Sequence, residues 1–373
     1  MWPLRSKHVI SCLLRFSLLS TAAGSVCASA APSLPMPQFR AENDWLKLPN
    51  GWMLGEVSGV DVDRAGHIWI LQRPRTLASA DRAHAAPPVM EFAPDGTYLS
   101  GFGGDGPGYD WPLTEHSIAV DGEGHVWISG NFRTDPATND DALLEFDRRG
   151  RFVRQIGGRG DGKGNADTSR VGAAADLFVD DAEHALYVAD GYLNRRVIVF
   201  DTRKGRFKRM WGAFGAPPPA TPTPPVRTAD APFVPETGDG PAGFNGVHGV
   251  EISRDGLVYV SDRSNQRIQV FTKEGKYLRQ TFVDRNQPSP ATASGIAFSA
   301  DRGQRYLYVA DFGNAKIVVL DRSTLAAIGV IGGRGTGAGQ FSGPHLIATD
   351  SRGVLYVAEA QGRRVQRFVP IGR

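Results

Sequence analysis

One sequence pattern recurs along most of the chain and restricts its fold more than any other feature. It consists of an apolar run, a tight turn rich in Asp, Ser and Gly, a second apolar run, a polar loop and a third run. Runs of β-branched and aromatic residues bounded by such turns predict short antiparallel strands. A period of roughly 40–60 residues indicates stacked copies of one unit. The six copies are SGVDVDRAGHIWILQR, HSIAVDGEGHVWISG, DLFVDDAEHALYVADGYLNRRVIVFD, HGVEISRDGLVYVSDRSNQRIQVF, SGIAFSADRGQRYLYVADFGNAKIVVLD and HLIATDSRGVLYVAEAQGRRVQRF.

Six such units predict an all-β, six-bladed β-propeller with one blade per copy. The last copy ends near Phe368, short of a full fourth strand, so an N-terminal strand is needed to close the ring. We expect Trp45–Asn50 to be that strand, because closure removes exposed sheet edges. Residues 45–373 are then the propeller and residues 31–44 an irregular lead-in. The Pro-rich insert at residues 216–243 is expected on the rim, between the third and fourth blades.

Residues 1–30 have the layout of a signal peptide. Arg5, Lys7 and Arg15 accompany a short apolar core at Phe16–Val26, and small residues follow at Ala28-Ser29-Ala30. The sequence therefore predicts export to the periplasm or the extracellular space. The apolar run is shorter than the roughly 20 residues that a membrane span needs. We expect no span after cleavage, with a retained anchor as the alternative.

Cleavage of this segment would change the composition of the chain in two ways. Both cysteines, Cys12 and Cys27, would be lost, so we expect no disulfide and no thiol ligand. Three of the 42 basic residues would also be lost, which leaves 39 basic against 39 acidic residues. This balance does not favour nucleic acid or an anionic membrane as a partner. We expect a monomer.

Four copies share an acid at the end of the second run and a base about five residues later. A feature common to several copies is best interpreted as structural, here as a tie between a turn and the next strand. The expected pairs are Asp190 with Arg196, Asp262 with Arg267, Asp311 with Lys316, and Glu359 with Arg364. The turn histidines His67, His125 and His184 are interpreted as solvated rim residues.

Three histidines remain when the shared features are set aside. The first residue of the innermost strand is, in order, Ser58, His116, Ala175, His248, Ser294 and His345. The histidines occupy alternate blades, which lie about 120° apart in a six-bladed ring, so their side chains should converge on the central channel. Three neutral imidazoles with an open fourth position are typical of a catalytic zinc site. The alternative is that each is an ordinary polar residue at a strand edge.

Three further residues depart from the repeat: Arg73, Tyr192 and Arg263. They are expected on the same rim of the propeller as His116, His248 and His345. The positions that match Arg263 hold Gly191, Phe312 and Ala360. Arginine holds a carboxylate through two parallel hydrogen bonds, so two guanidinium groups near a metal suit a small anionic or peptide-like substrate. A phenol in this position can act as a general base. The alternative is that all three are ordinary rim residues.

At this point the chain resembles a known family. The blades resemble NHL repeats. The segments EVSGVDVD…QR, EHSIAVD, VADGYLNRRV, VHGVEIS…SDRSNQRIQ and PHLIATD resemble the peptidyl-α-hydroxyglycine α-amidating lyases over residues 45–370. The resemblance implies zinc on His116, His248 and His345, Tyr192 as base, and Arg73 and Arg263 as substrate-positioning residues. It implies cleavage of a C-terminal α-hydroxyglycine to an amide and glyoxylate.

Two positions depart from the family pattern. Calcium ligands in the family include two backbone carbonyls, which correspond to Val60 and Ile118 here. The family's acidic calcium ligand, directly after the third zinc histidine, is Leu346 in this chain, which argues against calcium. The family's Met two residues before that histidine is Gly343.

The sequence thus favours an exported zinc-dependent carbon–nitrogen lyase. A first alternative is a non-catalytic NHL-repeat propeller that binds a partner or a glycan, which the changes at Leu346 and Gly343 favour. A second is a lactonase-like metal hydrolase. That class needs carboxylate and Asn ligands, whereas the predicted axis carries His, Ser and Ala.

Overall fold

The computed structural model describes residues 34–220, 237–287 and 291–372, so the predicted signal peptide lies outside the described residues. Residues from Leu34 onward form one compact unit. Among the described residues, no helix has the length and apolar character needed to cross a membrane.

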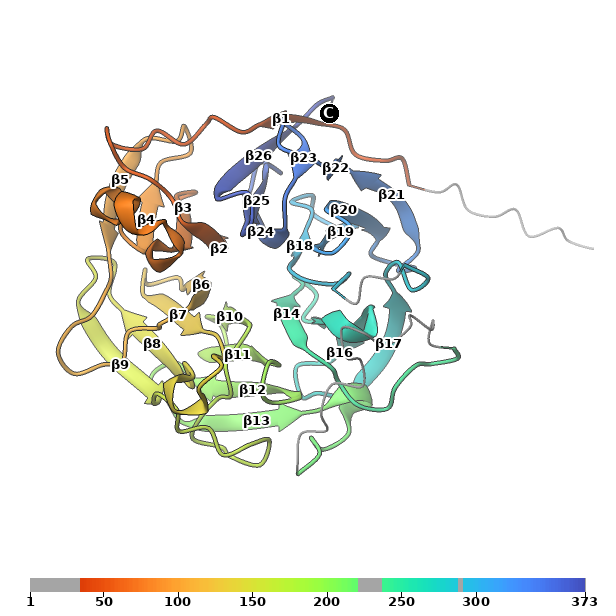
Figure 1. Cartoon of the computed structure of the whole chain (residues 1–373). Helices are drawn as coiled ribbons and strands as arrows, with labels where there is room; N and C mark the ends of the chain where they lie inside the picture. Colours follow the sequence, from red (N-terminus) through yellow and green to blue (C-terminus); the bar gives the residue numbers. More distant parts are fainter. Residues whose placement is uncertain (1–33, 221–236, 288–290, 373) are drawn as a thin grey trace, which may run out of the picture. The chain divides into compact units, whose positions relative to one another are not determined.

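The unit consists of six four-stranded antiparallel sheets arranged around an axis, which confirms the predicted six-bladed propeller (Figure 1). Blade 1 comprises β2 (Glu56–Val62), β3 (Ile68–Arg73), β4 (Val89–Phe92) and β5 (Tyr98–Phe102). Blade 2 comprises β6 (Glu115–Val120), β7 (Val126–Gly130), β8 (Ala142–Phe146) and β9 (Phe152–Gly157). Blade 3 comprises β10 (Asp176–Asp180), β11 (Ala185–Asp190), β12 (Arg196–Asp201) and β13 (Phe207–Trp211).

Blade 4 comprises β14 (Val247–Ile252), β15 (Val258–Asp262), β16 (Arg267–Phe271) and β17 (Tyr277–Phe282). Blade 5 comprises β18 (Ile296–Phe298), β19 (Tyr306–Asp311), β20 (Lys316–Asp321) and β21 (Ala327–Ile331). Blade 6 comprises β24 (Pro344–Thr349), β25 (Leu355–Glu359), β26 (Arg364–Pro370) and β1 (Phe39–Glu42). The first strand of each blade in chain order, or β24 in blade 6, lies nearest the axis (Figure 1).

The remaining elements are short and lie in the connections. The 3-10 helices are η1 (Pro74–Thr76), η2 (Ser79–His84), η3 (Pro136–Thr138), η4 (Ala213–Gly215) and η5 (Arg263–Asn265). Strands β22 (Gly333–Arg334) and β23 (Gln340–Phe341) form a small parallel pair between blades 5 and 6.

An N-terminal strand closes the ring, but it is not the predicted one. Strand β1 pairs with β26, from Phe39 opposite Pro370 to Glu42 opposite Arg367, so it lies inside the expected lead-in. Trp45–Asn50 forms only an isolated bridge at Lys47. The apolar residues of this segment serve packing and not strand pairing. The buried Trp45 ring packs on Tyr356, and its indole N–H donates to the Val365 carbonyl. Trp45 therefore joins blade 6 through its side chain.

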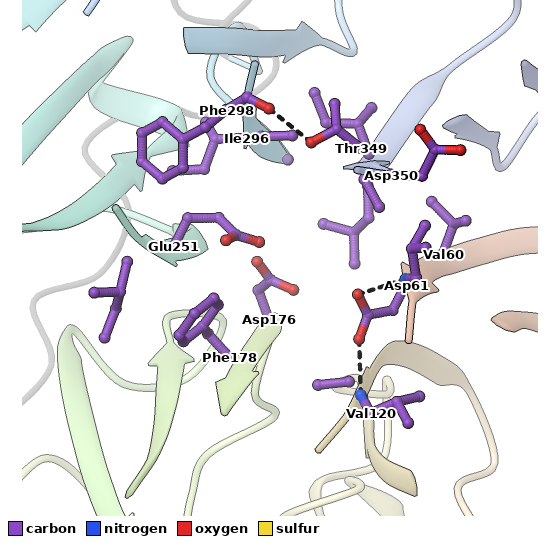
Figure 2. Close-up of a pocket in the computed structure, with 18 of the residues that line it drawn as sticks. Val60, Asp61, Val120, Asp176, Phe178, Glu251, Ile296, Phe298, Thr349 and Asp350 are labelled. Atoms are coloured by element: carbon purple, nitrogen blue, oxygen red, sulfur yellow. Dashed lines mark hydrogen bonds between the residues drawn. The ribbon is translucent and has the colours of Figure 1, made fainter. Parts of the chain in front are cut away.

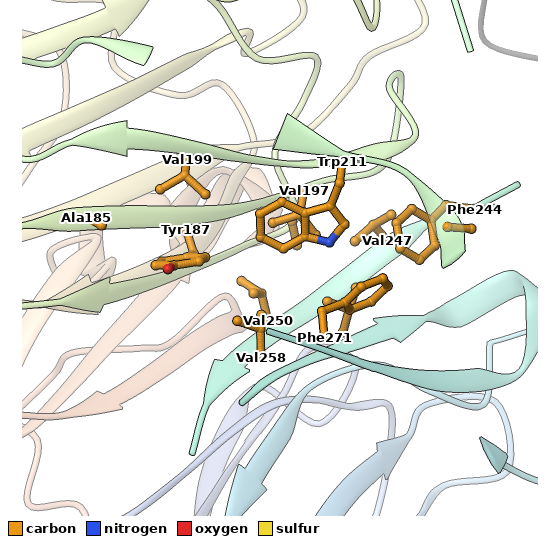
Figure 3. Packing of buried hydrophobic residues seen from close by; sticks show 13 residues of the cluster. Ala185, Tyr187, Val197, Val199, Trp211, Phe244, Val247, Val250, Val258 and Phe271 are labelled. Carbon is orange, nitrogen blue, oxygen red and sulfur yellow. The ribbon is translucent and has the colours of Figure 1, made fainter. Parts of the chain in front are cut away.

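The apolar core is divided among the interfaces between neighbouring blades. Figure 3 shows the interface of blades 3 and 4, where Tyr187, Trp211 and Phe271 pack with valines of both sheets. Valine is well suited to this position because β-branched side chains fit a pleated surface. Such packing fixes each inner strand relative to its neighbours, and the inner strands carry the site.

Three of the four predicted acid–base ties are present. Arg196 pairs with Asp190 at 2.8 Å and Arg267 with Asp262 at 2.8 Å, both fully buried, and Arg364 pairs with Glu359 at 2.7 Å. The fourth prediction was wrong. Lys316 pairs with Asp284 at 2.6 Å instead, and the Asp311 carboxylate accepts hydrogen bonds from the backbone and side chain of Asn314.

Candidate active site

The three predicted histidines meet at the propeller axis. They begin the inner strands of blades 2, 4 and 6, and their ring centroids are 4.7–5.2 Å apart. The ligand atoms of the three side chains all lie within 4.8 Å of one another. All three are buried, with His116 at 0%, His248 at 1% and His345 at 4% exposure.

Backbone carbonyls orient two of the three rings. His116 Nδ1 donates to the Ala175 carbonyl at 2.7 Å, and His345 Nδ1 donates to the Ser58 carbonyl at 2.6 Å. Each acceptor is the equivalent residue of the next blade. A donor at Nδ1 leaves Nε2 as an unprotonated acceptor, which is the form that binds a metal ion. The Nδ1 atom of His248 is buried without a hydrogen-bond partner in the described structure.

The surroundings keep the three imidazoles neutral. Burial, with Arg73 as a further cause, lowers the pKa of His345 to about 3. Burial also lowers the pKa of His116 and of His248 well below the ordinary value, assisted by the neighbouring histidines and by Arg263. Neutral imidazole is the metal-binding form, so the donor set and its environment fit zinc.

Tyr192 lies between two of the histidines. Its hydroxyl is 2.8 Å from His116 Nε2 and 3.1 Å from His248 Nε2, so both ring nitrogens point toward one place. The preceding Gly191 makes this approach possible. A Cβ atom at residue 191 would lie 2.0 Å from the Val247 carbonyl oxygen, which is beside His248. Only glycine allows the Tyr192 loop to pack this closely on β14.

The two predicted arginines have different surroundings. Arg263 Nη1 donates to the Tyr192 hydroxyl at 3.3 Å, and its guanidinium carbon lies 5.2 Å from the Tyr192 ring centroid. Its buried Nε has no hydrogen-bond partner among the described residues. Arg73, in contrast, is paired with Glu56 at 2.8 Å and donates to the Glu115 carbonyl at 2.6 Å. Of the two, Arg263 is therefore the better placed to receive a substrate anion.

Val60, Ile118 and Leu346 line one hollow of about 360 Å³, further along the inner strands from the histidines. Acidic side chains line the same hollow, and Figure 2 labels them as Asp61, Asp176, Glu251 and Asp350. Burial raises the pKa values of Asp61 and Asp176 to about 7. Sequence reasoning missed these acids, although Asp176 could have been found. It follows Ala175 in blade 3 as Leu346 follows His345 in blade 6.

The structure also gives a reason for the glycine at residue 343. Its φ angle is +67°, a left-handed backbone conformation that other residues adopt with strain. A Cβ atom there would lie 3.0 Å from the Phe312 ring. Methionine at this position would require a different local backbone.

Two of the turn histidines, His67 and His125, belong to charged networks and are only half-buried. His67 Nδ1 contacts Glu91 at 2.7 Å, and Arg148 pairs with Asp63 at 3.2 Å in the same group. His125 lies with Asp121 and Glu145, and Arg154 pairs with Glu145 at 2.6 Å. Because an arginine accompanies each set of carboxylates, both groups are explained as ion-pair networks.

The fold and the site together define a six-bladed β-propeller with a three-histidine cluster at its axis. A family model described as NHL repeat matches residues 244–271. NHL repeat-containing protein 3 of Mus musculus is 27% identical over 344 residues, covering 90% of this chain and 85% of that protein. The Homo sapiens protein of that name is 27% identical over 343 residues, covering 89% and 84%.

The chain is also similar to an amidating protein. Peptidylglycine alpha-amidating monooxygenase of Rattus norvegicus is 22% identical over 372 residues, which is 90% of this chain and 32% of that protein. The resemblance to NHL-repeat and amidating proteins is thereby confirmed. Two solved structures share the fold. Streptogramin B lyase has a TM-score of 0.54 at 12% identity, covering 89% of this chain and 98% of that chain. Virginiamycin B lyase from Staphylococcus aureus has a TM-score of 0.50 at 14% identity, covering 90% and 100%.

Proposed function

We propose that this protein is an exported zinc-dependent lyase that cleaves a carboxylated α-hydroxy-amide to an amide and glyoxylate. The observation that carries the proposal is the convergence of His116 and His248 on the Tyr192 hydroxyl, with His345 beside them. Export rests on the signal-like segment at residues 1–30.

The histidines would hold the zinc ion through neutral ring nitrogens. Bound zinc would supply Lewis acidity toward the hydroxyl group of the substrate. Carbonyl contacts from Ala175 and Ser58 already fix two of the rings, so little reorganisation is needed to bind the ion. We make no proposal for calcium at Val60 and Ile118, since Leu346 lacks an oxygen ligand.

The reaction also needs a group that binds the substrate carboxylate and a general base. Arg263 would bind the substrate carboxylate, because its guanidinium forms no salt bridge in the described part of the chain and touches Tyr192. Tyr192 would act as its phenolate and accept the hydroxyl proton. The oxygen electrons would then form the aldehyde C=O bond of glyoxylate while the carbon–nitrogen bond breaks. Tyr192 would return the proton to the released nitrogen, which regenerates the phenolate and consumes no water.

This proposal is tested with an N-acyl-α-hydroxyglycine and the zinc-loaded protein. Wild type should release glyoxylate, and Tyr192→Phe should lower kcat by about 100-fold or more, as expected for loss of a general base. Zinc content should stay unchanged in the variant. Tyr98→Phe, in the outer strand of blade 1, is the matched control and should retain activity. Absence of glyoxylate from the zinc-loaded wild type would refute the lyase reaction.

A second candidate function is a non-catalytic binding module. The pairing of Arg73 with Glu56 favours it, since one of the two expected substrate-holding groups is already neutralised. The chain is also similar to NHL repeat-containing protein 3, whose name refers to its repeats and to no reaction. Tight zinc binding without any glyoxylate release would support this function over the lyase.

A further inference from the structure

Phe132 is a large apolar side chain exposed beside the proposed active site. Its ring is 48% exposed, and its centroid lies 5.4 Å from that of Tyr192. Tyr192 in turn is 5.0 Å from His116 and 5.7 Å from His248, centroid to centroid. An aromatic ring that is half open to water and touches the proposed base has apolar surface available for a ligand.

The position of Phe132 departs from the repeat in the same way as Tyr192 does. Phe132 stands two residues after β7, and Tyr192 stands two residues after β11. The matching residues of blades 4, 5 and 6 are Ser264, Gly313 and Gln361, none of which is aromatic. Two neighbouring blades therefore each place one aromatic ring at this position, and the two rings lie side by side.

The loop that carries Phe132 is held in place by hydrogen bonds. Asn131 N–H donates to the Thr114 carbonyl at 2.9 Å, and Asp140 N–H donates to the Asn131 carbonyl at 3.1 Å. Phe132 N–H donates to the Asn131 side-chain oxygen at 2.6 Å. These hydrogen bonds hold the backbone of the loop at the rim, and the Phe132 ring is exposed from a fixed position.

Arg263 and Phe132 flank Tyr192 from the two adjacent blades. Arg263 belongs to blade 4 and Phe132 to blade 2, with Tyr192 of blade 3 between them. A substrate whose carboxylate binds Arg263, and whose hydroxyl lies at Tyr192 and the histidines, has its amide nitrogen as the remaining point of extension. The acyl group on that nitrogen can then extend away from Arg263, toward Phe132.

We propose that Phe132 forms a subsite for an apolar acyl group, so that the preferred substrates are α-hydroxyglycines acylated with an aromatic or branched aliphatic group. This inference rests on the proposed lyase function and names its substrate class. Such a substrate has a carboxylate at one end, which matches the charge of Arg263, and an apolar group at the other end, which matches the exposed surface of Phe132.

The test compares two substrates, N-phenylacetyl-α-hydroxyglycine and N-acetyl-α-hydroxyglycine. Phe132→Ala should lower kcat/KM for the phenylacetyl compound about five- to tenfold, mainly through KM, and change the acetyl compound less than about twofold. Phe132→Leu should recover part of the difference. Phe207→Ala removes an aromatic ring of similar exposure, 38%, on the outer strand β13 and should change neither value. An equal effect of Phe132→Ala on both substrates would overturn the subsite.

A binding experiment separates the subsite from the lyase reaction. If zinc-loaded wild type turns over neither compound, calorimetry with N-phenylacetylglycine and N-acetylglycine decides the question. Tighter binding of the phenylacetyl compound that disappears in Phe132→Ala keeps the subsite while the lyase function fails. Equal binding of both compounds, or no binding of either, overturns the subsite as well.

Discussion

At the scale of single residues, the proposed site depends on which positions of the repeat carry a polar ring. His116 and His345 each donate to the equivalent residue of the next blade, so their ring orientation follows from their place in the ring. Tyr192 reaches His116 and His248 because Gly191 presents no Cβ atom to the Val247 carbonyl. The packing of Tyr192 against the histidines therefore depends on a glycine at residue 191.

The acidic hollow leads to a prediction at the same scale. Burial, Asp176 and Asp61 raise the pKa of Glu251 well above its ordinary value of 4.5. The folded protein thus keeps a proton on Glu251 at pH values where the unfolded chain has lost it. The stability contributed by this group is full below pH 4.5 and falls as the pH rises toward the folded pKa.

Glu251→Gln removes this dependence, because glutamine does not ionise. We expect the variant to raise the unfolding midpoint by a few degrees at pH 8 and to leave it nearly unchanged at pH 4.5, measured by thermal unfolding. Glu123→Gln, which changes an exposed glutamate, is the control and should have little effect at either pH. An equal shift for Glu251→Gln at both pH values would contradict the protonated state of Glu251 in the folded protein.

At the scale of secondary-structure elements, several blades are joined by a clamp, defined as a base after a third strand that pairs with an acid in the first turn of the preceding blade. Arg148 pairs with Asp63 at 3.2 Å, Lys273 with Asp180 at 2.5 Å, and Arg322 with Asp255 at 2.8 Å. The corresponding position of blade 3 is Thr202, which has no charge to offer blade 2. A hollow of about 610 Å³ lies there, lined by Asp121 and Thr202 among others.

Thr202→Lys should supply the missing clamp between blades 2 and 3. The expected gain is about 0.5–1 kcal/mol in the free energy of unfolding, because partly exposed ion pairs contribute little more. Urea unfolding at low and high salt measures it, and the gain should shrink at high salt. Thr202→Gln, which has length without charge, is the control. A gain that is the same for lysine and glutamine would show that packing, and not the ion pair, is responsible.

At the scale of the whole propeller, the first and last blades are joined by two devices close together in sequence. Strand β1 completes blade 6, and Trp45 packs among residues of blades 1 and 6. Trp45→Ala should lower the free energy of unfolding by about 3–5 kcal/mol, as loss of a buried tryptophan usually does. Urea denaturation measures this, with Trp52→Ala as the half-buried control. A similar small loss for both variants would contradict a ring-closing role for Trp45.

The ring architecture also explains what the sequence could predict. The repeat gave blade number and strand order, and ring symmetry brought His116, His248 and His345 together because equivalent positions share one height. Contacts that are specific to one blade could not be predicted from the repeat. Arg73 is neutralised by Glu56, its cross-strand neighbour at the end of β2, and Phe132 lies in the loop after β7; neither contact belongs to the pattern that the six copies share.

The closing strand illustrates a different limit. Phe39–Glu42 and Trp45–Asn50 are both short segments with apolar residues, and either could complete blade 6 on pattern alone. Tertiary contacts decide between them: Phe39 packs its ring against Tyr308 and Phe368, whereas Trp45 inserts its side chain beside Tyr356. Strand preference depends on such packing more than on local sequence.

The central claim is that the axial histidines form a zinc site, and metal analysis of the purified protein tests it most directly. Wild type should contain stoichiometric zinc, and His248→Ala should lose it, while His84→Ala, which removes an exposed rim histidine, should retain it. Wild-type protein that takes up no zinc, or His248→Ala protein that keeps it, would contradict the account.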